Sequence, residues 1–312
     1  MDVFTTVVSC ILGLAVGDAL GVPYEFMRRD QAAAAELEHM RSGGYHQQPA
    51  GAWSDDTAMA LASMDSLIRS GSFDAEDMMA AFQDWYRKAV YTSTGETFGV
   101  GGTVFRALHR ARAGVPALRC GPTGIRDNGN GALMRFAPVA LYCVFRELPR
   151  AEEVQLVSDA SAITHGHAIS KLGCQIYTDF LRVLVKDGDK ETAYRTICAE
   201  NYEVYFPADA VKAYERILDG ALSDLPRRWL RESGYVVDTL EAALWATLRE
   251  DSYVDAVGEV IHLGYDTDTA AAVTGSLCGV LYGRESIPRE WRDELLRREY
   301  LEDLCEKFSQ IL

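Results

Sequence analysis

The pattern of apolar and polar positions is helical along nearly the whole chain. Apolar residues recur every three or four positions, and Asp, Pro or Gly often stand where such a segment begins or ends. Residues 5–20 are apolar on most sides, which predicts a central buried helix, and residues 267–282 are rich in Ala and Gly, which favours close packing. The predicted helices span residues 5–20, 56–70, 74–88, 102–113, 131–146, 151–163, 167–186, 189–200, 208–220, 238–250, 252–263, 267–282 and 288–310.

Strand patterns are nearly absent. The best candidate is "GYVVDTL" at residues 234–240, and it is short. Loops concentrate at residues 21–54 and 114–131. The chain contains no shift in composition, Pro/Ser-rich linker or repeat of fixed period. We therefore expect one all-α domain covering residues 1–312.

Composition and charge narrow the class of ligand. Of the 312 residues, 48% are hydrophobic and 25% charged, which is typical of a globular protein, and the net charge is −15. No basic field exists to attract phosphate polymers, so we expect no binding to nucleic acid or to an anionic membrane. The affinity for any small anion must come from backbone N–H groups, helix N-termini or bound metal.

The apolar N-terminal stretch, "MDVFTTVVSCILGLAVGDAL", could be mistaken for a signal peptide. It has no basic residues before the apolar run, Asp2 opens it and Asp18 closes it, so we expect a buried helix of the folded protein. We also expect that no apolar run reaches the roughly 20 residues that span a bilayer. Seven cysteines are scattered without a CxxC pair, which indicates reduced thiols and a cytoplasmic protein.

Two pairs of carboxylates stand at the starts of predicted helices. Asp55 and Asp56 precede the helix at 56–70, and Asp266 and Asp268 flank the start of the helix at 267–282. One Asp per helix would satisfy the need for a cap, and helix capping remains one explanation of either pair. Two per helix invite repulsion between like charges. Such groups with neighbouring hydroxyls suit Mg²⁺ or Mn²⁺, and no His/Cys cluster with zinc spacing competes.

If the two helix starts converge, four carboxylates meet, and Glu25 in "GDALGVPYEF" could be a fifth. Five negative charges in one dry pocket would be untenable without counter-charge. Two divalent ions, at the ~3.5–4 Å separation of two-metal sites, would supply most of it. Spacing along the sequence does not establish the convergence, which is therefore a hypothesis.

The chain resembles the ADP-ribosylglycohydrolases, from about residue 11 to about residue 283. Five ordered motifs carry the resemblance, and the order is more specific than any one of them. The motifs are "GLAVGDALGVPYEF" (13–26), "WSDDTAMALA" (53–62), "GNGALMRFAPVAL" (129–141), "THGH" (164–167) and "GYDTDTAAAVTGSLCGVLYG" (264–283).

The resemblance implies a compact all-α fold of orthogonally packed helices with a binuclear Mg²⁺ or Mn²⁺ centre. Glu25 would be a ligand or a gate, and Asp127 and Asn130 would face the ribose. Glu25, Asp127 and Asp56 are the candidate catalytic residues. The implied metal ligands are Ser54, Asp55, Asp56, Asp266, Asp268 and Thr269. The candidate substrate-binding residues, from these motifs and from the glycine-rich segments described below, are Gly101, Gly102, Asn130, Gly131, His165 and Tyr265.

Three positions depart from the family pattern. Tyr265 stands where the family usually has the second glycine of a pair, Ala168 where proline is frequent, and Ser54 where threonine is common. The serine keeps the hydroxyl. Tyr265 adds a large ring that could reshape the substrate pocket without removing a ligand.

Glycine-rich segments are candidates for binding the diphosphate of ADP-ribose. "GVGGT" (99–103) and "DNGNG" (127–131) both precede predicted helices and would present N–H groups, although ordinary turns have the same composition. We expect Arg135 to be a structural ion-pair partner rather than a phosphate ligand. Tyr91, Phe98 and Phe136 are candidates for stacking on adenine, with packing the better explanation for Phe136.

The implied activity is hydrolysis of the bond between ADP-ribose and a protein side chain, with arginine the favoured acceptor. The partner would be an ADP-ribosylated protein. One alternative is a family member that binds ADP-ribose or a partner without cleavage. A two-metal phosphohydrolase, which needs similar carboxylates, is a second alternative. A third is protection against an ADP-ribosyltransferase toxin, by reversing its reaction or by blocking it directly.

Overall fold

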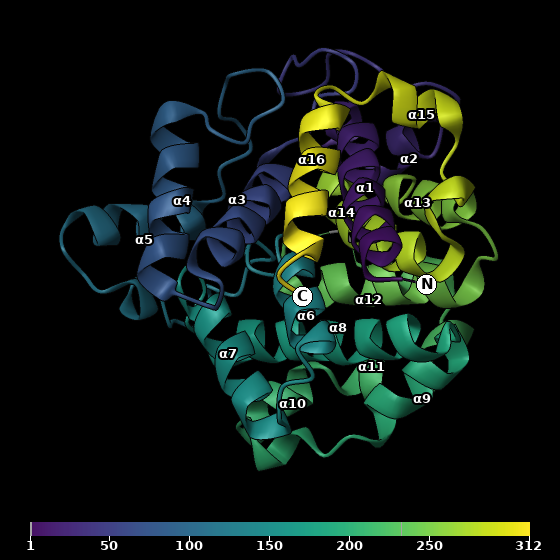
Figure 1. Ribbon diagram of the computed structural model, residues 1–312. Coiled ribbons are helices and arrows are strands. Elements are labelled where there is room, and N and C mark those ends of the chain that lie inside the picture. The colour runs from purple at the N-terminus through teal and green to yellow at the C-terminus, as the bar shows by residue number, and fades with distance from the viewer. Residues whose placement is uncertain (1, 232) are drawn as a thin grey trace.

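Two helices in direct backbone contact form the centre of the molecule. The computed structural model describes residues 2–231 and 233–312. In it, helix α1 (Val3–Gly21) lies antiparallel to α14 (Thr267–Tyr282), and Figure 1 shows them side by side. A Cβ on Gly17 would lie 2.1 Å from the carbonyl oxygen of Ala271, and a Cβ on Gly275 would lie 2.2 Å from that of Gly13. Only glycine permits this approach, because a side chain would overlap with the facing backbone.

The remaining helices surround this pair, and α8 crosses below it (Figure 1). α3 and α16 pack on α1, whereas α12 and α13 pack on α14, and α4 and α5 extend outward from α3. α6, α7 and α9 pack against α8. The bounds of these helices are α3 Asp55–Ser70, α4 Ala75–Lys88, α5 Gly102–Arg112, α6 Ala137–Phe145, α7 Arg150–Ala162, α8 Ala168–Asp187, α9 Lys190–Ala199, α12 Val236–Arg249, α13 Tyr253–Ile261 and α16 Arg298–Ser309. The prediction of an all-α fold is confirmed.

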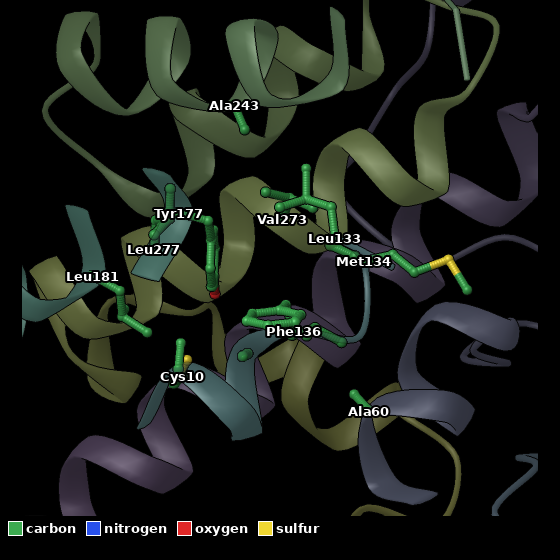
Figure 2. Packing of buried hydrophobic residues seen from close by; sticks show 14 of the residues in the cluster. Cys10, Ala60, Leu133, Met134, Phe136, Tyr177, Leu181, Ala243, Val273 and Leu277 are labelled. Atoms are coloured by element: carbon green, nitrogen blue, oxygen red, sulfur yellow. The ribbon is translucent and has the colours of Figure 1, made fainter. Parts of the chain in front are cut away.

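The core is continuous between the two halves. Figure 2 shows Phe136 and Tyr177 between α14 and the helices around α8. Both side chains are fully buried, and the Tyr177 hydroxyl lies 2.7 Å from Ser276 Oγ on α14. The hydroxyl of a buried tyrosine needs such a partner, so the Tyr177–Ser276 hydrogen bond fixes α8 relative to α14.

All seven cysteines are free thiols, and six of them are buried.

Several predicted boundaries are wrong for identifiable reasons. Residues 234–240 form no strand, since α12 begins at Val236 and the apolar pattern continues to Arg249. The helix predicted from residue 131 begins only at Ala137, where Pro138 stands in its first turn. The last predicted helix is interrupted before Arg297, whose φ is 50°.

Short helices account for the other differences. The segment predicted as one helix at 208–220 is divided at Tyr214, and the segment predicted as a loop at 21–54 contains a helical turn. The bounds of the short helices are α2 Arg29–Ala32, α10 Ala208–Ala213, α11 Glu215–Leu218 and α15 Arg289–Glu294.

The expectation that no segment could span a bilayer is wrong if length and apolar composition are the only criteria. Residues Val3–Tyr24 are long and apolar enough to do so. However, 83% of the most apolar part of this segment is buried inside the structure. Burial against α14 and α16 explains the apolar composition, as is usual for a central helix.

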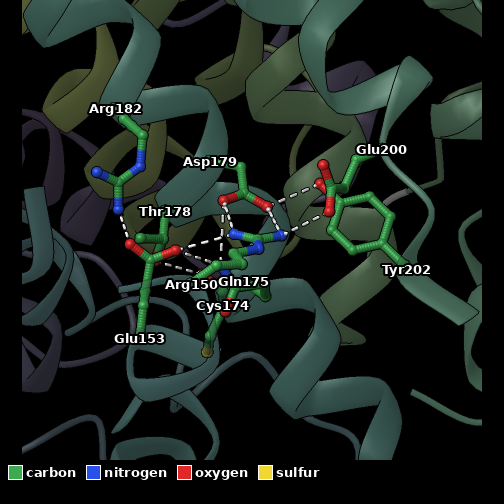
Figure 3. Close-up of polar contacts among 9 residues, drawn as sticks. All are labelled: Arg150, Glu153, Cys174, Gln175, Thr178, Asp179, Arg182, Glu200 and Tyr202. Carbon is green, nitrogen blue, oxygen red and sulfur yellow. Dashed lines mark hydrogen bonds and ion pairs between the residues drawn. The ribbon is translucent and has the colours of Figure 1, made fainter. Parts of the chain in front are cut away.

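A polar network fixes α7 on α8 (Figure 3). Arg150 donates hydrogen bonds to Glu153 at 2.9 Å and to Asp179 at 3.0 Å, and Arg182 forms a second ion pair with Glu153. The Tyr202 hydroxyl donates to the same Asp179 carboxylate at 3.0 Å. Each buried carboxylate therefore has a cationic partner, as buried charges require.

The close contact of α1 and α14 leads to a stability prediction. We expect Gly17→Ala to reduce the free energy of unfolding by about 2–3 kcal/mol, because the added methyl forces two backbones apart. Urea denaturation measures the change. Gly258→Ala is the matched control, since its Cβ would meet only Leu37 Cδ1 at 3.6 Å in the middle of α13. Equal stability of the two variants would contradict the prediction.

Candidate active site

A buried carboxylate on α1 holds the start of α3. Asp18 accepts hydrogen bonds from the Ser54 and Thr57 backbone N–H groups, both at 3.0 Å, and from the Thr57 hydroxyl at 2.6 Å. Ser54 itself caps α3 by accepting from the Asp56 N–H at 3.2 Å. Asp18 and Ser54 thus satisfy the first turn of α3. Capping therefore does not account for Asp55 and Asp56.

The starts of α3 and α14 lie against the same cavity of about 310 Å³. Thr269 of α14 donates a hydrogen bond to Asp56 of α3 over 3.4 Å. Oxygen atoms of Glu25, Asp266 and Asp268 lie within 4.8 Å of one another, in a group that could hold a metal ion. The carboxylates that line the cavity are those of Glu25, Asp55, Asp56, Asp266 and Asp268.

These carboxylates destabilise one another. Burial, and then the charges of Asp56 and Glu25, raise the pKa of Asp55 well above its ordinary value. Burial and neighbouring carboxylates likewise raise the pKa of Asp56 and of Asp268. Burial raises the pKa of Asp18, behind them, to about 6. Among the described residues, the cavity lining includes no lysine or arginine to compensate.

The donor set fits a hard divalent cation. Asp56 Oδ1 is buried and has no hydrogen-bond partner among the described residues, so a strong acceptor lies unused at the cavity. Buried polar atoms of this kind require a partner. The neighbouring donors are carboxylate and hydroxyl oxygens, which Mg²⁺ and Mn²⁺ prefer.

A histidine that no sequence pattern singles out holds Glu25. His46 Nε2 lies 2.5 Å from Glu25 Oε2, and both side chains are largely buried. Glu25 follows the short 3₁₀ helix Val22–Tyr24 that extends α1. His46 lies in the 21–54 loop, so the loop fixes the position of one carboxylate of the cluster.

Glycines bring the backbone close to the acidic groups. Gly99 has a φ of 80°, and a Cβ there would lie 2.2 Å from Asp55 Oδ1. Gly101 and Gly102, which form the N-terminus of α5, line the cavity; a Cβ on Gly101 would meet open space, and one on Gly102 would meet only Arg106 Nη1, at 3.9 Å. The 99–102 segment therefore leaves room for a ligand at the positive end of a helix.

A chain of hydrogen bonds sets the proton on His165. Arg135 can only donate, and it donates to Thr164 Oγ1 at 2.9 Å. Thr164 Oγ1 lies 3.1 Å from His165 Nδ1, and its own proton has no other acceptor among the described residues. In the tautomer that gives the Thr164 hydroxyl proton an acceptor, His165 Nδ1 accepts and Nε2 carries the hydrogen. Burial lowers the pKa of His165 to about 3, so the ring is neutral.

The expected ion pair of Arg135 is wrong for the part of the chain that the structure describes. The guanidinium is fully buried, lies 4.6 Å from the centre of the Phe82 ring and donates to the Ala160 carbonyl at 2.9 Å. Burial lowers its pKa to about 10. Arg135 is structural, but its partners are a ring, a carbonyl and a hydroxyl.

Asn130 lies at the cavity and Asp127 does not line it. Asn130 donates to Asp266 Oδ2 at 2.8 Å and to Thr239 Oγ1 at 2.9 Å. Asp127 accepts from Arg106 at 2.5 Å and from the Gly124 N–H at 3.1 Å. Asn130 therefore connects α12 to the acidic cluster, whereas Asp127 lies outside it, paired with a cation.

The other candidates divide between the lining and the surrounding structure. Gly131, His165, Tyr265 and Thr269 line the cavity, and Ser54 lies behind Asp56, to which it donates at 3.0 Å. The aromatic candidates lie away from the lining. Phe136 is in the core, the Tyr91 hydroxyl bonds Asp65 at 2.6 Å, and the Phe98 ring lies 5.1 Å from that of His46.

The electrostatics lead to a second prediction. In the metal-free protein, we expect Asp268→Asn to raise the melting temperature by several degrees, because it removes one of several buried like charges and keeps the acceptor for the Thr269 N–H. We expect added Mg²⁺ or Mn²⁺ to raise the melting temperature of the wild type but not of the variant.

Differential scanning calorimetry, with chelator or with metal, measures both changes. Asp187→Asn, an exposed carboxylate at the end of α8, is the control with the same change of charge. Equal metal-dependent shifts in the two variants would exclude Asp268 as a ligand.

Comparison with known proteins places this geometry in a family. The ADP-ribosylglycohydrolase family model matches residues 1–312. An ADP-ribosylarginine hydrolase Tri1 of Serratia proteamaculans is 33% identical over 95% of this chain and 77% of its own. An ADP-ribosyl-[dinitrogen reductase] glycohydrolase of Rhodospirillum rubrum is 29% identical over 91% and 88%. A solved structure titled "ADP-ribosylglycohydrolase-related protein complex" superposes with a TM-score of 0.80, 31% identity and 99% coverage of both chains. The chain therefore belongs to the ADP-ribosylglycohydrolase family.

Proposed function

We propose that the protein hydrolyses the N-glycosidic bond between ADP-ribose and an arginine side chain of a modified protein. The observation that carries the proposal is the cavity itself, where buried carboxylates of α3 and α14 meet beside the N-terminus of α5. Two relatives named as ADP-ribosylarginine hydrolases, from Serratia proteamaculans and Pseudomonas putida, favour arginine as the acceptor. The chain would act as one domain, and its free thiols suit the reducing cytoplasm.

The acidic cluster would hold two Mg²⁺ or Mn²⁺ ions. When bound, the ions would lower the pKa of a water molecule and polarise the ribose hydroxyls. The metal ligands would be Ser54, Asp55, Asp56, Asp266, Asp268 and Thr269, with Glu25 beside them; Ser54 also donates a hydrogen bond to Asp56.

The protein's own groups would bind and orient the sugar and the diphosphate. The neutral His165 ring would donate its Nε2–H to a diphosphate oxygen, and the Gly101 and Gly102 N–H groups would face the same anion. Gly131 lets the chain approach His165, since a Cβ there would lie 3.0 Å from the ring carbon Cε1.

Two carboxylates are candidates to stabilise the developing charge. Asn130 would hold Asp266 in place while the carboxylates beside Asp266 face the ribose. Glu25, inside the cavity, is better placed than Asp127 to stabilise positive charge at the anomeric carbon, because Asp127 lies outside the lining and is paired with Arg106.

The direct test is release of ADP-ribose from arginine-linked and serine-linked ADP-ribosylated proteins. We expect release from arginine with Mg²⁺ or Mn²⁺ and none with a chelator. We expect Asp55→Ala to reduce the rate by more than about 100-fold, because even the loss of a group behind a metal ligand costs 10–100-fold.

Chromatography of the products separates the alternatives, and circular dichroism checks that the variant is folded. Release of inorganic phosphate from nucleotides would support a two-metal phosphohydrolase. Tight binding of ADP-ribose without cleavage would support a binding protein. Near-normal activity of folded Asp55→Ala would refute the metal assignment.

The hydrogen-bond chain behind His165 leads to a separate prediction. We expect Thr164→Val to raise KM for the ADP-ribosylated substrate about tenfold, because the histidine proton is no longer held on Nε2 and one charge-assisted hydrogen bond weakens. We expect Thr164→Ser, which keeps the hydroxyl, to behave as the wild type.

Nitrogen-15 NMR of the histidine ring reports the tautomer directly. A wild-type ring with its hydrogen on Nδ1, or a Thr164→Val variant with unchanged KM, would show that the chain does not act in this way.

A further inference from the structure

Two bulky aromatic residues at the mouth of the cavity have backbone conformations that such residues rarely adopt. Phe26 has a φ of 64° and Tyr265 a φ of 62°. Short hydrogen bonds hold the two segments together: the Phe26 N–H donates to the Tyr265 carbonyl at 2.6 Å, and the Tyr265 N–H donates to the Met27 carbonyl at 2.7 Å. Strain of this kind persists where the surroundings enforce it, often at functional sites.

The two rings remain exposed instead of packing in the core. Phe26 is 48% exposed and Tyr265 is 46% exposed, with ring centres 6.0 Å apart and planes at 76°. The ring of Tyr45, which is 70% exposed, meets Phe26 edge-on at 4.8 Å. Burial therefore does not explain three large aromatic side chains at this rim.

Phe26 and Tyr265 also separate two hollows. Both residues line the acidic cavity, and both line a second, more open hollow of about 640 Å³, whose other lining residues are Met27, Arg28, Arg29, Asp30 and Ala33. The α5 residues that face the proposed diphosphate position line the first hollow and not the second. A ligand that extends from the acidic cavity into the second hollow passes these two rings.

The chemistry of the rings favours a planar cation. Aromatic ring faces attract cations, above all the guanidinium group, and Phe26 and Tyr265 present exposed rings beside the acidic cavity. We propose that Phe26 and Tyr265 form a clamp for the guanidinium of the modified arginine, and that the second hollow receives the adjoining polypeptide of the substrate protein. This inference rests on the proposed arginine-directed hydrolysis and assigns the side of the site that binds the acceptor.

The clamp determines which acceptor side chain binds and does not accelerate cleavage of the bond. An arginine side chain that carries ADP-ribose keeps its positive charge, so the rings attract it before the bond breaks. A serine acceptor has neither charge nor a planar group. Loss of a ring should therefore weaken binding of the arginine-linked substrate and leave binding of ADP-ribose itself unchanged.

Tyr265→Gly and Tyr265→Leu test the clamp. Glycine also relieves the strain at φ 62°, so we expect a higher melting temperature together with a KM for ADP-ribosyl-arginine protein raised roughly five- to tenfold. We expect kcat, and the inhibition constant of free ADP-ribose, to stay within about twofold of the wild type, because uniform binding affects KM alone. Tyr265→Phe keeps the ring and should restore KM.

Phe4→Leu is the matched control, since Phe4 is an exposed aromatic residue on α1 that lies outside both linings. An unchanged KM in Tyr265→Gly and Tyr265→Leu would overturn the clamp. A weaker inhibition constant for ADP-ribose, in parallel with KM, would also overturn it and would assign the rings to adenine.

Failure of the proposed function gives a different result. If the wild type releases no ADP-ribose from arginine, calorimetric titration with ADP-ribosyl-agmatine and with ADP-ribose still tests the clamp. Tighter binding of the guanidinium compound, lost in Tyr265→Gly, supports it, and equal affinities overturn it.

Discussion

The direct contact between α1 and α14 is the constraint on which the site depends. Gly13 and Gly17 of α1 lie against the backbone of α14 so closely that a single methyl group would overlap with it. Because the helices are antiparallel, the end of α1 that leads to Glu25 lies beside the start of α14, where Asp266 and Asp268 stand. Asp18 extends the same arrangement to α3 by holding its first turn. Carboxylates far apart in the sequence thus come together through backbone packing, without any direct attraction between them.

The cluster is costly to the fold in the absence of cations. Burial and mutual repulsion raise the pKa of Asp55, Asp56 and Asp268 well above the ordinary range, which means that the charged forms are disfavoured. Rigid surroundings have to keep the charges together until a ligand compensates them. The glycine contacts of α1, together with a core that continues through Tyr177 and Ser276, provide that rigidity. A functional site of this kind lowers local stability, and packing in the remainder of the fold offsets that loss.

The sequence predicted the helical class and most helices, because 3.6-residue periodicity and capping residues are local signals. It misplaced the start of α6 and missed the interruption of the last helix before Arg297. Turn geometry depends on distant contacts, such as the hydrogen bond that the Asn130 N–H donates to the Gly234 carbonyl ahead of α6. The sequence showed two carboxylates at each helix start where capping needs one. The proximity of the two pairs, however, depends on tertiary packing. His46 carried no signal beyond its residue type, and its role follows from the folding of the 21–54 loop onto Glu25. The one local clue to Asp18 was a charge inside an otherwise apolar helix.

The two sides of the cavity solve different recognition problems. On the α5 side, the proposed ligand is an anion bound to an acidic protein, so recognition would use backbone N–H groups and the neutral His165, which is linked to Arg135 through Thr164. The cationic side chain nearest to Gly102, that of Arg106, is paired with Asp127 outside the cavity lining. On the Phe26 side, the proposed ligand is a cation, and exposed rings can bind it without adding charge. In the proposed mode of binding, the acidic cluster thus separates the two ends of the substrate, with the diphosphate at the helix N-terminus and the guanidinium at the aromatic rim.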